Sequence, residues 1–278
     1  MIVYLNGEYL PLEQAHVSPL DRGFLFADGI YEVVRFDGGR AYRLAEHVER
    51  LAEGLAALRL PMDAGFYPGV SGRLLEENGL LGSDAIVYAQ VTRGAAPRTH
   101  AFPPADTPPT VFAFARMSDP PPPEGGTAIL LPDERWGRCD IKSVMLLPNV
   151  LAAQAAKEAG AIDAIFVRDG LALEGTKANL FLVQDGLVRT AENGPRILPG
   201  VTRGATLEAA RRFGHEVSER AFTVAEMLAA DEVFLASTSL WTHSLISIDG
   251  KTIGTGQPGP VAAALREVLQ GEFRREGA

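Results

Sequence analysis

A proline- and glycine-rich stretch near the middle of the chain constrains the fold more than any other feature. Residues 118–126 read Ser-Asp-Pro-Pro-Pro-Pro-Glu-Gly-Gly. Four consecutive prolines form a stiff extended spacer, and the glycines after them restore flexibility. A chain of 278 residues, 46% of them hydrophobic, is long enough for two cores. We therefore predict a small N-terminal domain over residues 1–118, a linker over 119–126 and a larger C-terminal domain over 127–278.

Both predicted domains mix strands and helices. Asn6-Gly7 separates two short apolar runs and is a residue pair that tight hairpin turns prefer. Apolar residues recur at helical spacing from Leu44 to Leu58, which predicts an amphipathic helix. In the second half, predicted strands alternate with helices, and one helix is expected over 203–213 with Thr202 as its N-cap. This mixture indicates an α/β or α+β fold rather than a helical bundle or a β-sandwich.

The charge and hydropathy patterns exclude several classes of function. The formal net charge is −9, whereas binding to a phosphate backbone needs a basic face, so no nucleic-acid partner is expected. No apolar run approaches the ~20 residues that cross a bilayer, and the N-terminus lacks the pattern of a signal peptide. Cys139 is the single cysteine, so no internal disulfide can form. We expect a soluble, cytoplasmic protein with no membrane partner and no metal site.

Lys142 has unusual neighbours for a lysine. Ile141 precedes it, an apolar run follows at 144–147, and Pro148 opens an alanine-rich, helix-forming stretch that ends at Gly160. Desolvation lowers the pKa of a lysine, which is the property that a Schiff-base lysine needs. Taken alone, the residue is better explained as a surface lysine at the end of a strand, so its interpretation depends on the rest of the chain.

Three features are candidates for binding an anion. Residues 197–203, Ile-Leu-Pro-Gly-Val-Thr-Arg, form a turn that leads into a helix, whose first N–H groups and Thr202 hydroxyl can donate to a phosphate. Ser237-Thr238-Ser239 follows a predicted strand, where ligands of α/β proteins commonly lie. Arg50, on the predicted helix over 44–58, can supply a full positive charge. Each feature is weak alone, because helix caps are common and helical arginines are usually solvated.

Three further residues are candidates for contacts with a cofactor or a substrate. Glu174 stands between a turn and an apolar strand, where a carboxylate can pair with a protonated ring nitrogen, as enzymes that use pyridoxal 5'-phosphate (PLP) require. Arg98 and His100 alternate in an extended loop, so their side chains can point the same way and converge on a carboxylate. The simpler interpretation of Glu174 is a surface glutamate in a turn, and that of Arg98 and His100 is a solvated loop.

Together these segments resemble those of a known family. The sequence resembles the fold-type IV PLP-dependent aminotransferases, and within them the bacterial D-amino acid aminotransferases. The resemblance extends almost from end to end of the chain. Its most specific segments are LDRGFLFADGIYEVVR, EHVERL, QVTRGAAPRTHAFP, RWGRCDIKSVMLLPNVLAAQAA, LEGTKANLF, ILPGVTR, EVFLASTS and ISIDGK. It implies a two-domain fold-type IV fold and a transaminase that acts by a ping-pong mechanism between a D-amino acid, such as D-alanine, and a 2-oxo acid, such as 2-oxoglutarate.

The resemblance also implies a role for each candidate residue. Lys142 would be the Schiff-base lysine and proton shuttle, and Glu174 would hold the pyridine nitrogen protonated. Leu198 would pack against the ring of the cofactor, and the phosphate would be bound by Arg50, Val201, Thr202, Ser237 and Thr238. The α-carboxylate of the substrate would be bound by Tyr31, Arg98 and His100, the last two from the partner subunit. This arrangement implies an obligate homodimer with the active site at the subunit interface.

Three positions depart from the pattern of the D-amino acid enzymes. Leu240 and Trp241 stand in place of a serine and a glutamate, and Lys177 stands in place of a small residue. Trp241 would reshape the pocket if it lay beside it, whereas Lys177 is expected to be solvated.

Three alternative functions stay open at this point. A branched-chain L-amino acid aminotransferase and an aminodeoxychorismate lyase would share Lys142 and the fold, but neither needs a carboxylate site made from Arg98 and His100. The third alternative is a non-catalytic PLP-binding or interaction protein, and an intact Lys142 and Glu174 count against it.

Overall fold

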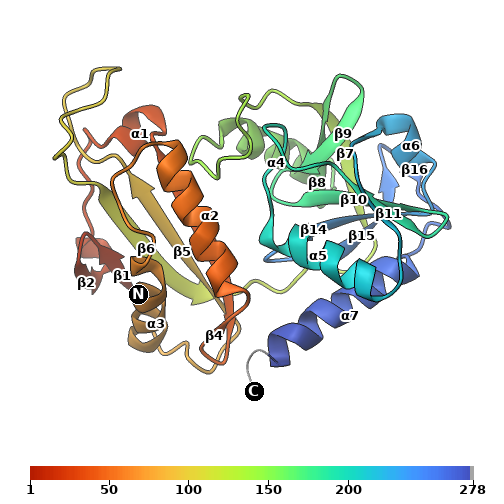
Figure 1. Ribbon diagram of the computed structural model, residues 1–278, viewed down its shortest axis with the longest axis horizontal. Helices are drawn as coiled ribbons and strands as arrows, with labels where there is room; N and C mark the ends of the chain where they lie inside the picture. Colours follow the sequence, from red (N-terminus) through yellow and green to blue (C-terminus); the bar gives the residue numbers. More distant parts are fainter. Residues whose placement is uncertain (276–278) are drawn as a thin grey trace. The chain divides into compact units, whose positions relative to one another are not determined.

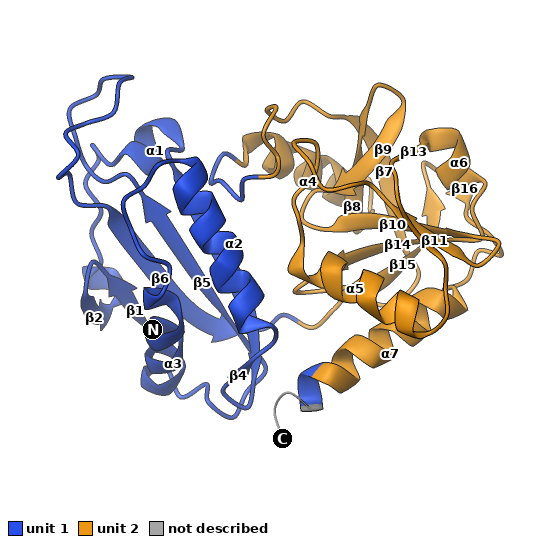
Figure 2. Ribbon diagram, viewed as in Figure 1, with its two compact units in different colours: residues 1–119, 141–145, 273–278 blue, residues 120–140, 146–272 orange. Residues whose placement is uncertain are grey.

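The computed structural model of the protein describes residues 1–275, which form two compact units (Figure 2). Unit 1 comprises Met1–Asp119 and Ile141–Met145, together with residues 273–275, and unit 2 comprises Pro120–Asp140 and Leu146–Glu272. The first division falls inside the predicted linker. The lysine segment and the last described residues group with unit 1, which differs from the continuous ranges that we expected for the two domains.

Unit 1 is built on a six-stranded antiparallel sheet (Figure 1). Its strands, in the order β2-β1-β6-β5-β3-β4, are β1 (Ile2–Leu5), β2 (Glu8–Pro11), β3 (Gly29–Asp37), β4 (Arg40–Ala41), β5 (Ala85–Thr92) and β6 (Thr110–Met117). Its helical segments are the 3-10 turn η1 (Leu12–Gln14), α1 (Arg22–Phe26), α2 (Leu44–Ala57) and α3 (Phe66–Glu77).

Local sequence signals account for much of unit 1. The hairpin between β1 and β2 turns at Asn6, with φ 51°, and Gly7, with φ 101°, and these are residue types that adopt a left-handed backbone readily. The helix predicted from its apolar spacing is observed as α2, which packs against β3 and buries Leu51 and Leu55. The apolar stripe in the sequence is therefore the face of α2 that covers the sheet.

Unit 2 is built on a ten-stranded mixed sheet. Its strands are β7 (Gly126–Pro132), β8 (Asp163–Arg168), β9 (Leu171–Gly175), β10 (Asn179–Gln184), β11 (Leu187–Thr190), β12 (Val217–Glu219), β13 (Phe222–Thr223), β14 (Glu232–Ser237), β15 (Trp241–Ile248) and β16 (Lys251–Thr252). The order is β12-β11-β10-β14-β15-β7-β8-β9-β13, and β16 pairs with β15. A further pairing of Glu174 on β9 with Asn179 on β10 closes β10-β14-β15-β7-β8-β9 into a ring. Glu174 therefore lies where the ring closes.

The helices of unit 2 are α4 (Leu147–Glu158), α5 (Val201–Arg212), α6 (Val224–Leu228) and α7 (Pro260–Arg275). Helix α4 packs on β7 and β8, and α5 packs on β14 (Figure 1). Helix α5 also packs on β12, and α6 packs on β9 and β13. The expected N-cap of α5 was wrong: the helix begins at Val201 with Gly200 as its N-cap, so Thr202 lies inside the first turn. A Cβ on residue 200 would lie 2.1 Å from Oδ1 of Asn179, so only glycine fits at this position.

Within residues 1–275, none of the helices has both the length and the apolar character needed to span a membrane. The same residues contain no group of three or more His, Cys, Asp or Glu side chains arranged to hold a metal ion.

Candidate active site

The candidate residues are divided between the two units. Unit 1 contains Tyr31, Arg50, Arg98, His100 and Lys142, and unit 2 contains Glu174, Leu198, Val201, Thr202, Ser237 and Thr238. Each unit orders its own group through a separate set of buried contacts.

Lys142 is anchored to the beginning of β3. The N–H of Tyr31 donates to the carbonyl oxygen of Lys142 at 3.0 Å, and the N–H of Val144 donates to the carbonyl oxygen of Gly29 at 3.0 Å. The half-buried side chain places Nζ 4.3 Å from the centroid of the Tyr31 ring, within the range of a cation–π contact. Unit 1 therefore brings together two of the predicted site residues, Lys142 and Tyr31, and fixes the backbone of both.

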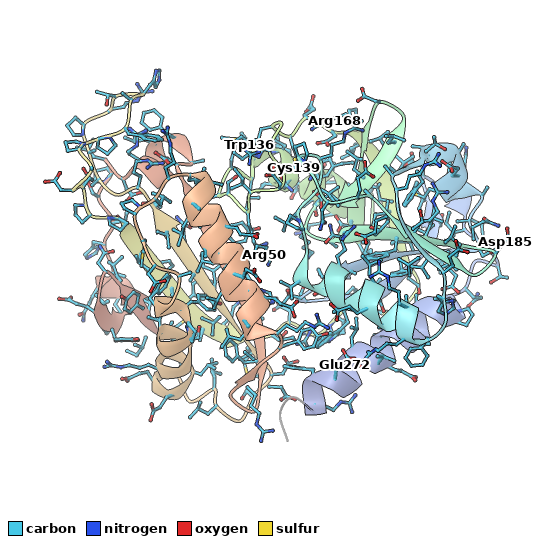
Figure 3. The ribbon with its side chains drawn as sticks, in the orientation of Figure 1. Arg50, Trp136, Cys139, Arg168, Asp185 and Glu272 are labelled. Atoms are coloured by element: carbon cyan, nitrogen blue, oxygen red, sulfur yellow. The ribbon has the colours of Figure 1, made fainter. Side chains whose placement is uncertain are left out.

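Arg50 is held by a buried carboxylate that we did not identify in the sequence. Its Nε donates to Oε2 of Glu32 at 2.9 Å and its Nη2 donates to Oε1 at 2.6 Å, while Nδ1 of His47 lies 3.0 Å from Oε1. His47 and Arg50 are three residues apart on α2 (Figure 3 labels Arg50), so both reach the same group on β3. Burial alone would raise the pKa of Glu32, but Arg50 and His47 together hold it below its usual range.

The signal for Glu32 was present in the sequence. Ile30, Glu32, Val34 and Phe36 alternate along β3, so Glu32 is a carboxylate in an otherwise apolar, inward-facing row. A buried charge needs a partner, so the sequence already indicated that Glu32 would pair with a cation, such as the arginine on the predicted helix over 44–58.

Arg98 and His100 are both exposed and both lie against one aromatic ring. The guanidinium carbon of Arg98 is 5.2 Å from the centroid of the Phe26 ring, and the His100 ring packs edge-on against the same ring at 5.7 Å. The structure thus brings these two predicted residues together. For Tyr31 it records contacts with Lys142 and a stacked contact with Tyr88 at 5.5 Å.

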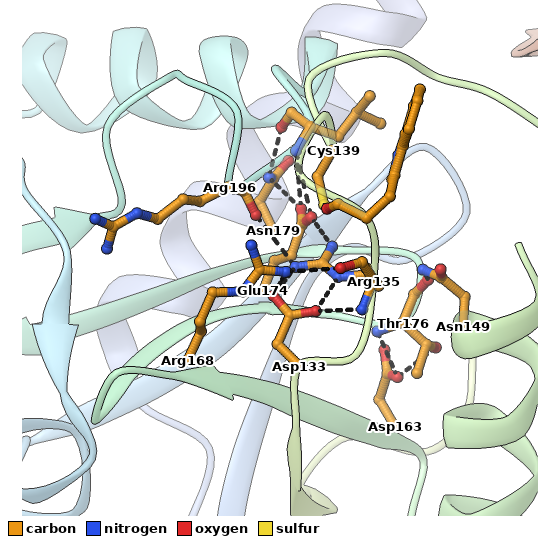
Figure 4. Close-up of polar contacts among 12 residues, drawn as sticks. Asp133, Arg135, Cys139, Asn149, Asp163, Arg168, Glu174, Thr176, Asn179 and Arg196 are labelled. Atoms are coloured by element: carbon orange, nitrogen blue, oxygen red, sulfur yellow. Dashed lines mark hydrogen bonds and ion pairs between the residues drawn. The ribbon is translucent and has the colours of Figure 1, made fainter. Parts of the chain in front are cut away.

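Glu174 is a buried carboxylate at the point where β9 meets β10. It forms an ion pair with Nη1 of Arg135, and its Oε2 accepts from Nδ2 of Asn179 at 3.2 Å and from the N–H of Leu198 at 3.2 Å (Figure 4). Burial raises the pKa of Glu174 to about 7, although Arg135 opposes the increase. Arg135 therefore favours the anionic form of this carboxyl group, against the effect of its burial.

Arg135 belongs to a chain of alternating charges. Its Nε and Nη2 donate to the two oxygens of Asp133 at 2.8 and 3.0 Å, and Arg168 contacts Asp133 at 3.0 Å from the other side. The Arg135 guanidinium also lies over the ring of Phe166 at 4.3 Å. Arg135 and Asp133 are nearly fully buried. We did not identify either residue as part of the site from the sequence, although both lie in the segment that leads to Lys142.

The turn before α5 is fixed to the same cluster. Nδ2 of Asn179 donates to the carbonyl oxygen of Leu198 at 2.8 Å, so the backbone N–H and C=O of Leu198 are both held by the Glu174 cluster. The N-cap of α5 is Gly200, which has no side chain to accept from the first turn, and this turn contains the buried residues Val201 and Thr202. The N–H groups of this turn form the positive end of a 12-residue helix.

The second hydroxyl cluster lies at the end of β14, the strand on which α5 packs. Ser237 and Thr238 are half-buried, and Oγ of Ser237 lies 3.3 Å from Oγ of Ser239. The N–H of Leu240 donates to the carbonyl oxygen of Ser237 at 3.2 Å, which folds the residues into a turn. Hydroxyl donors and a helix N-terminus are thus carried by two elements that pack together.

The positions that depart from the D-amino acid pattern lie in different surroundings. Leu240 and Trp241 are 7% and 4% exposed, Leu240 packs in a core cluster of unit 2, and Trp241 has a φ of 58°. A bulky residue rarely adopts this backbone conformation. Lys177 is exposed to solvent.

Comparisons with known proteins define the family. Residues 29–244 match the model for class IV aminotransferases, and the chain belongs to this family. It is 38% identical to a D-alanine aminotransferase of Bacillus licheniformis, with 100% of this chain and 99% of that relative covered. It is 37% identical to a D-alanine aminotransferase of Staphylococcus epidermidis, with 95% of each covered.

Solved structures show the same fold. A branched-chain amino acid aminotransferase of T.th., complexed with N-(5'-phosphopyridoxyl)-L-glutamate, has a TM-score of 0.88 and 26% identity, covering 99% of this chain and 94% of that chain. The structure of the T.th. enzyme with pyridoxamine 5'-phosphate gives the same values. The predicted fold class and the prediction of an enzyme of the aminotransferase class are therefore confirmed.

Proposed function

We propose that this aminotransferase is a PLP-dependent D-amino acid transaminase, which moves an amino group between a D-amino acid such as D-alanine and a 2-oxo acid such as 2-oxoglutarate. The observation that carries the proposal is the similarity to D-alanine aminotransferases, at 34–38% identity over 95% or more of the chain. The adjacent side chains of Arg98 and His100 support it, because they offer a cation and an imidazole to a substrate carboxylate.

The residues present fit the chemistry of PLP. A phosphate dianion needs N–H and hydroxyl donors, and the first turn of α5 and the Ser237 turn offer both. A protonated ring nitrogen needs a carboxylate, and Glu174 is a buried one. We assign Lys142 to the covalent bond with the cofactor and Leu198 to the face of the ring. The phosphate would be bound by Arg50, Val201, Thr202, Ser237 and Thr238.

When bound, PLP supplies an electron-withdrawing ring that stabilises negative charge at the substrate Cα. Glu174, ionised beside Arg135, holds a proton on the ring nitrogen. The amine of Lys142 would take the proton from the substrate Cα as a general base and, as a general acid, would pass it to the cofactor carbon that bears the amino nitrogen rather than back to Cα. Tyr31, Arg98 and His100 bind the α-carboxylate, and this fixes which Cα hydrogen faces Lys142. Stereospecificity for D-amino acids then follows from where the carboxylate is held.

The proposal also covers the substrates, a homodimeric assembly and a cytoplasmic location. The substrates are small amino acids and 2-oxo acids. Arg98 and His100 lie on the surface of unit 1, which suits side chains that complete the site of a second subunit in a homodimer. We place the dimer in the cytoplasm, where a chain with a single cysteine needs no disulfide.

A branched-chain L-amino acid aminotransferase is the second candidate, because solved structures of such enzymes match the whole chain. One experiment separates the two. The purified protein is loaded with PLP, and the visible absorption of the lysine-bound cofactor is followed after addition of D-alanine or L-leucine. The proposal expects bleaching with D-alanine, with pyruvate formed when 2-oxoglutarate is supplied. Bleaching by L-leucine alone would establish the branched-chain alternative instead.

A further inference from the structure

A buried arginine on α1 faces the loop that carries Arg98 and His100. The loop joins β5 to β6 and lies next to α1 in Figure 1, and both belong to unit 1. Helix α1 is itself fixed to the end of β5: Oγ1 of Thr92 donates to Oδ2 of Asp21 at 2.9 Å, and the N–H of Arg22 donates to the carbonyl oxygen of Gly94 at 2.9 Å. Any contact from α1 to the loop therefore starts from a rigid base.

Arg22 binds the backbone of the loop around His100. Its Nη1 donates to the carbonyl oxygens of Thr99 at 2.7 Å and Ala101 at 3.3 Å, and its Nη2 donates to the carbonyl oxygen of His100 at 3.4 Å. Arg22 is only 3% exposed, whereas residues 98–100 are exposed. The planar, multidentate guanidinium group thus holds three successive carbonyls of a surface segment from below.

Asp28 fixes the guanidinium of Arg22 in turn. Its Oδ2 accepts from Nε of Arg22 at 2.8 Å and from Nε of Arg93 at 2.8 Å. Arg93, at the base of the loop, also donates to the carbonyl oxygens of Leu58 at 2.7 Å and Arg59 at 3.2 Å, at the end of α2. Burial would raise the pKa of Asp28, but Arg93 and Arg22 hold it below its usual range, so the carboxylate is charged at neutral pH.

Phe26 supplies the surface on which the two loop side chains lie. Its ring contacts Arg98 at 5.2 Å and His100 at 5.7 Å, and Arg22 lies over the same ring at 4.8 Å. Helix α1 therefore contacts the loop in two ways. Arg22 binds the backbone at residues 99–101, and Phe26 contacts the side chains of Arg98 and His100.

We propose that Arg22, Phe26 and Asp28 are positioning residues, which hold Arg98 and His100 in place to bind the substrate carboxylate. This inference rests on the proposed function of Arg98 and His100. A carboxylate gains most from donors that are already in place, because ordering a flexible loop on binding would cost part of the interaction energy. Arg22 and Asp28 order the backbone before the substrate arrives, and Phe26 sets the directions of the two side chains.

The test compares two reagents that differ in a carboxylate. Aminooxyacetate and methoxyamine both react with the lysine-bound cofactor and bleach its visible band, but only aminooxyacetate carries a carboxylate. The variants are Arg22→Lys, which keeps the charge beside Asp28 but loses the forked donation, and Phe26→Leu, which removes the ring from a half-buried position. Arg116→Lys, on an exposed arginine of β6, is the control, and Arg98→Ala tests the proposed carboxylate site itself.

We expect Arg22→Lys and Phe26→Leu to slow the reaction with aminooxyacetate and to raise KM for D-alanine by on the order of 10-fold, because small displacements of a binding group are costly. The reaction with methoxyamine, which offers no carboxylate to Arg98 and His100, should change less than about twofold, and Arg116→Lys should match the wild type throughout.

The outcomes distinguish the carboxylate site of Arg98 and His100 from the positioning role of Arg22 and Phe26. If Arg98→Ala slows aminooxyacetate but Arg22→Lys and Phe26→Leu do not, the positioning role is overturned and the carboxylate site stands. If Arg98→Ala has no effect, the assigned carboxylate site is wrong and the positioning role fails with it. Equal losses with both reagents in a folded variant would show a general structural role and overturn the inference. Should Arg22→Lys not fold, Phe26→Leu decides.

Discussion

Replacing Arg135 with glutamine tests how Glu174 stays ionised. Arg135 forms an ion pair with Glu174 on one side and hydrogen bonds with Asp133 on the other. Asp133 keeps a second cation, because Arg168 lies 3.0 Å from it. The substitution therefore removes the positive charge mainly from Glu174, in a site where burial already raises the pKa of that carboxyl to about 7.

The expected size follows from these contacts. A hydrogen bond to a charged group contributes about 1.5–3 kcal/mol. Since about 1.36 kcal/mol corresponds to one pH unit, the midpoint of a profile governed by Glu174 should move upward by about 1–2 pH units. Glu174 acts when ionised, so the activity of both proteins should rise with pH through this midpoint. Well below the wild-type midpoint the variant should be about 10- to 100-fold less active than the wild type, and at high pH the difference should largely disappear.

The assay is the pH profile of kcat/KM for D-alanine between pH 6.5 and 9.5. The matched control is Arg138→Gln, because Arg138 lies in the same segment but is half-exposed and pairs with Asp140. The ionisation of D-alanine acts on all three proteins alike, so the separation between profiles is the quantity to compare. A loss that is the same at every pH would refute the reasoning, since Arg135 would then not control the ionisation of Glu174.

Three further predictions concern single residues. Borohydride should fix the cofactor to Lys142; peptide mapping that found the adduct on Lys157, Lys177 or Lys251 would contradict the assignment. Glu32→Gln should lower the free energy of unfolding by about 3–5 kcal/mol, because Arg50 loses a buried charged partner; an unchanged urea midpoint would argue against this. Glu232 accepts from the N–H groups of Val261 and Ala262, both at 2.9 Å, at the start of α7, and glutamine has only one acceptor oxygen. Glu232→Gln should therefore cost about 1–3 kcal/mol in urea unfolding, and a variant as stable as wild type would show that these donors find another partner.

The features that local signals determine could be predicted from the sequence. Helix α2 was expected from its apolar spacing, and the first hairpin from Asn6-Gly7. Each depends on residues within one or two turns of chain, where periodicity and backbone preference act directly. The N-cap of α5 was misplaced because the prediction relied on the capping preference of threonine, whereas the helix begins two residues earlier than expected, at Val201, with Gly200 as its cap.

The buried charges around the candidate residues could not be predicted in the same way. Periodicity indicates which residues face inward, but it does not say which buried charge meets which. Glu32 and Arg50 come from a strand and a helix, and Arg135 and Glu174 from a loop and a strand. Their pairing is decided by the three-dimensional packing, so the ionisation of Glu174 can be read only from the folded chain.

The anchoring of Lys142 to Gly29 and Tyr31 has a consequence for synthesis of the protein. These contacts join residues that are far apart in the chain. Residues 120–140, which belong to unit 2, emerge from the ribosome before the lysine segment does. Until then the beginning of β3 has an unpaired edge, and an open strand edge can pair with another chain. A nascent chain or a fragment that stops at Asp119 should therefore be prone to self-association, and it should become less so once residues 141–145 have been added.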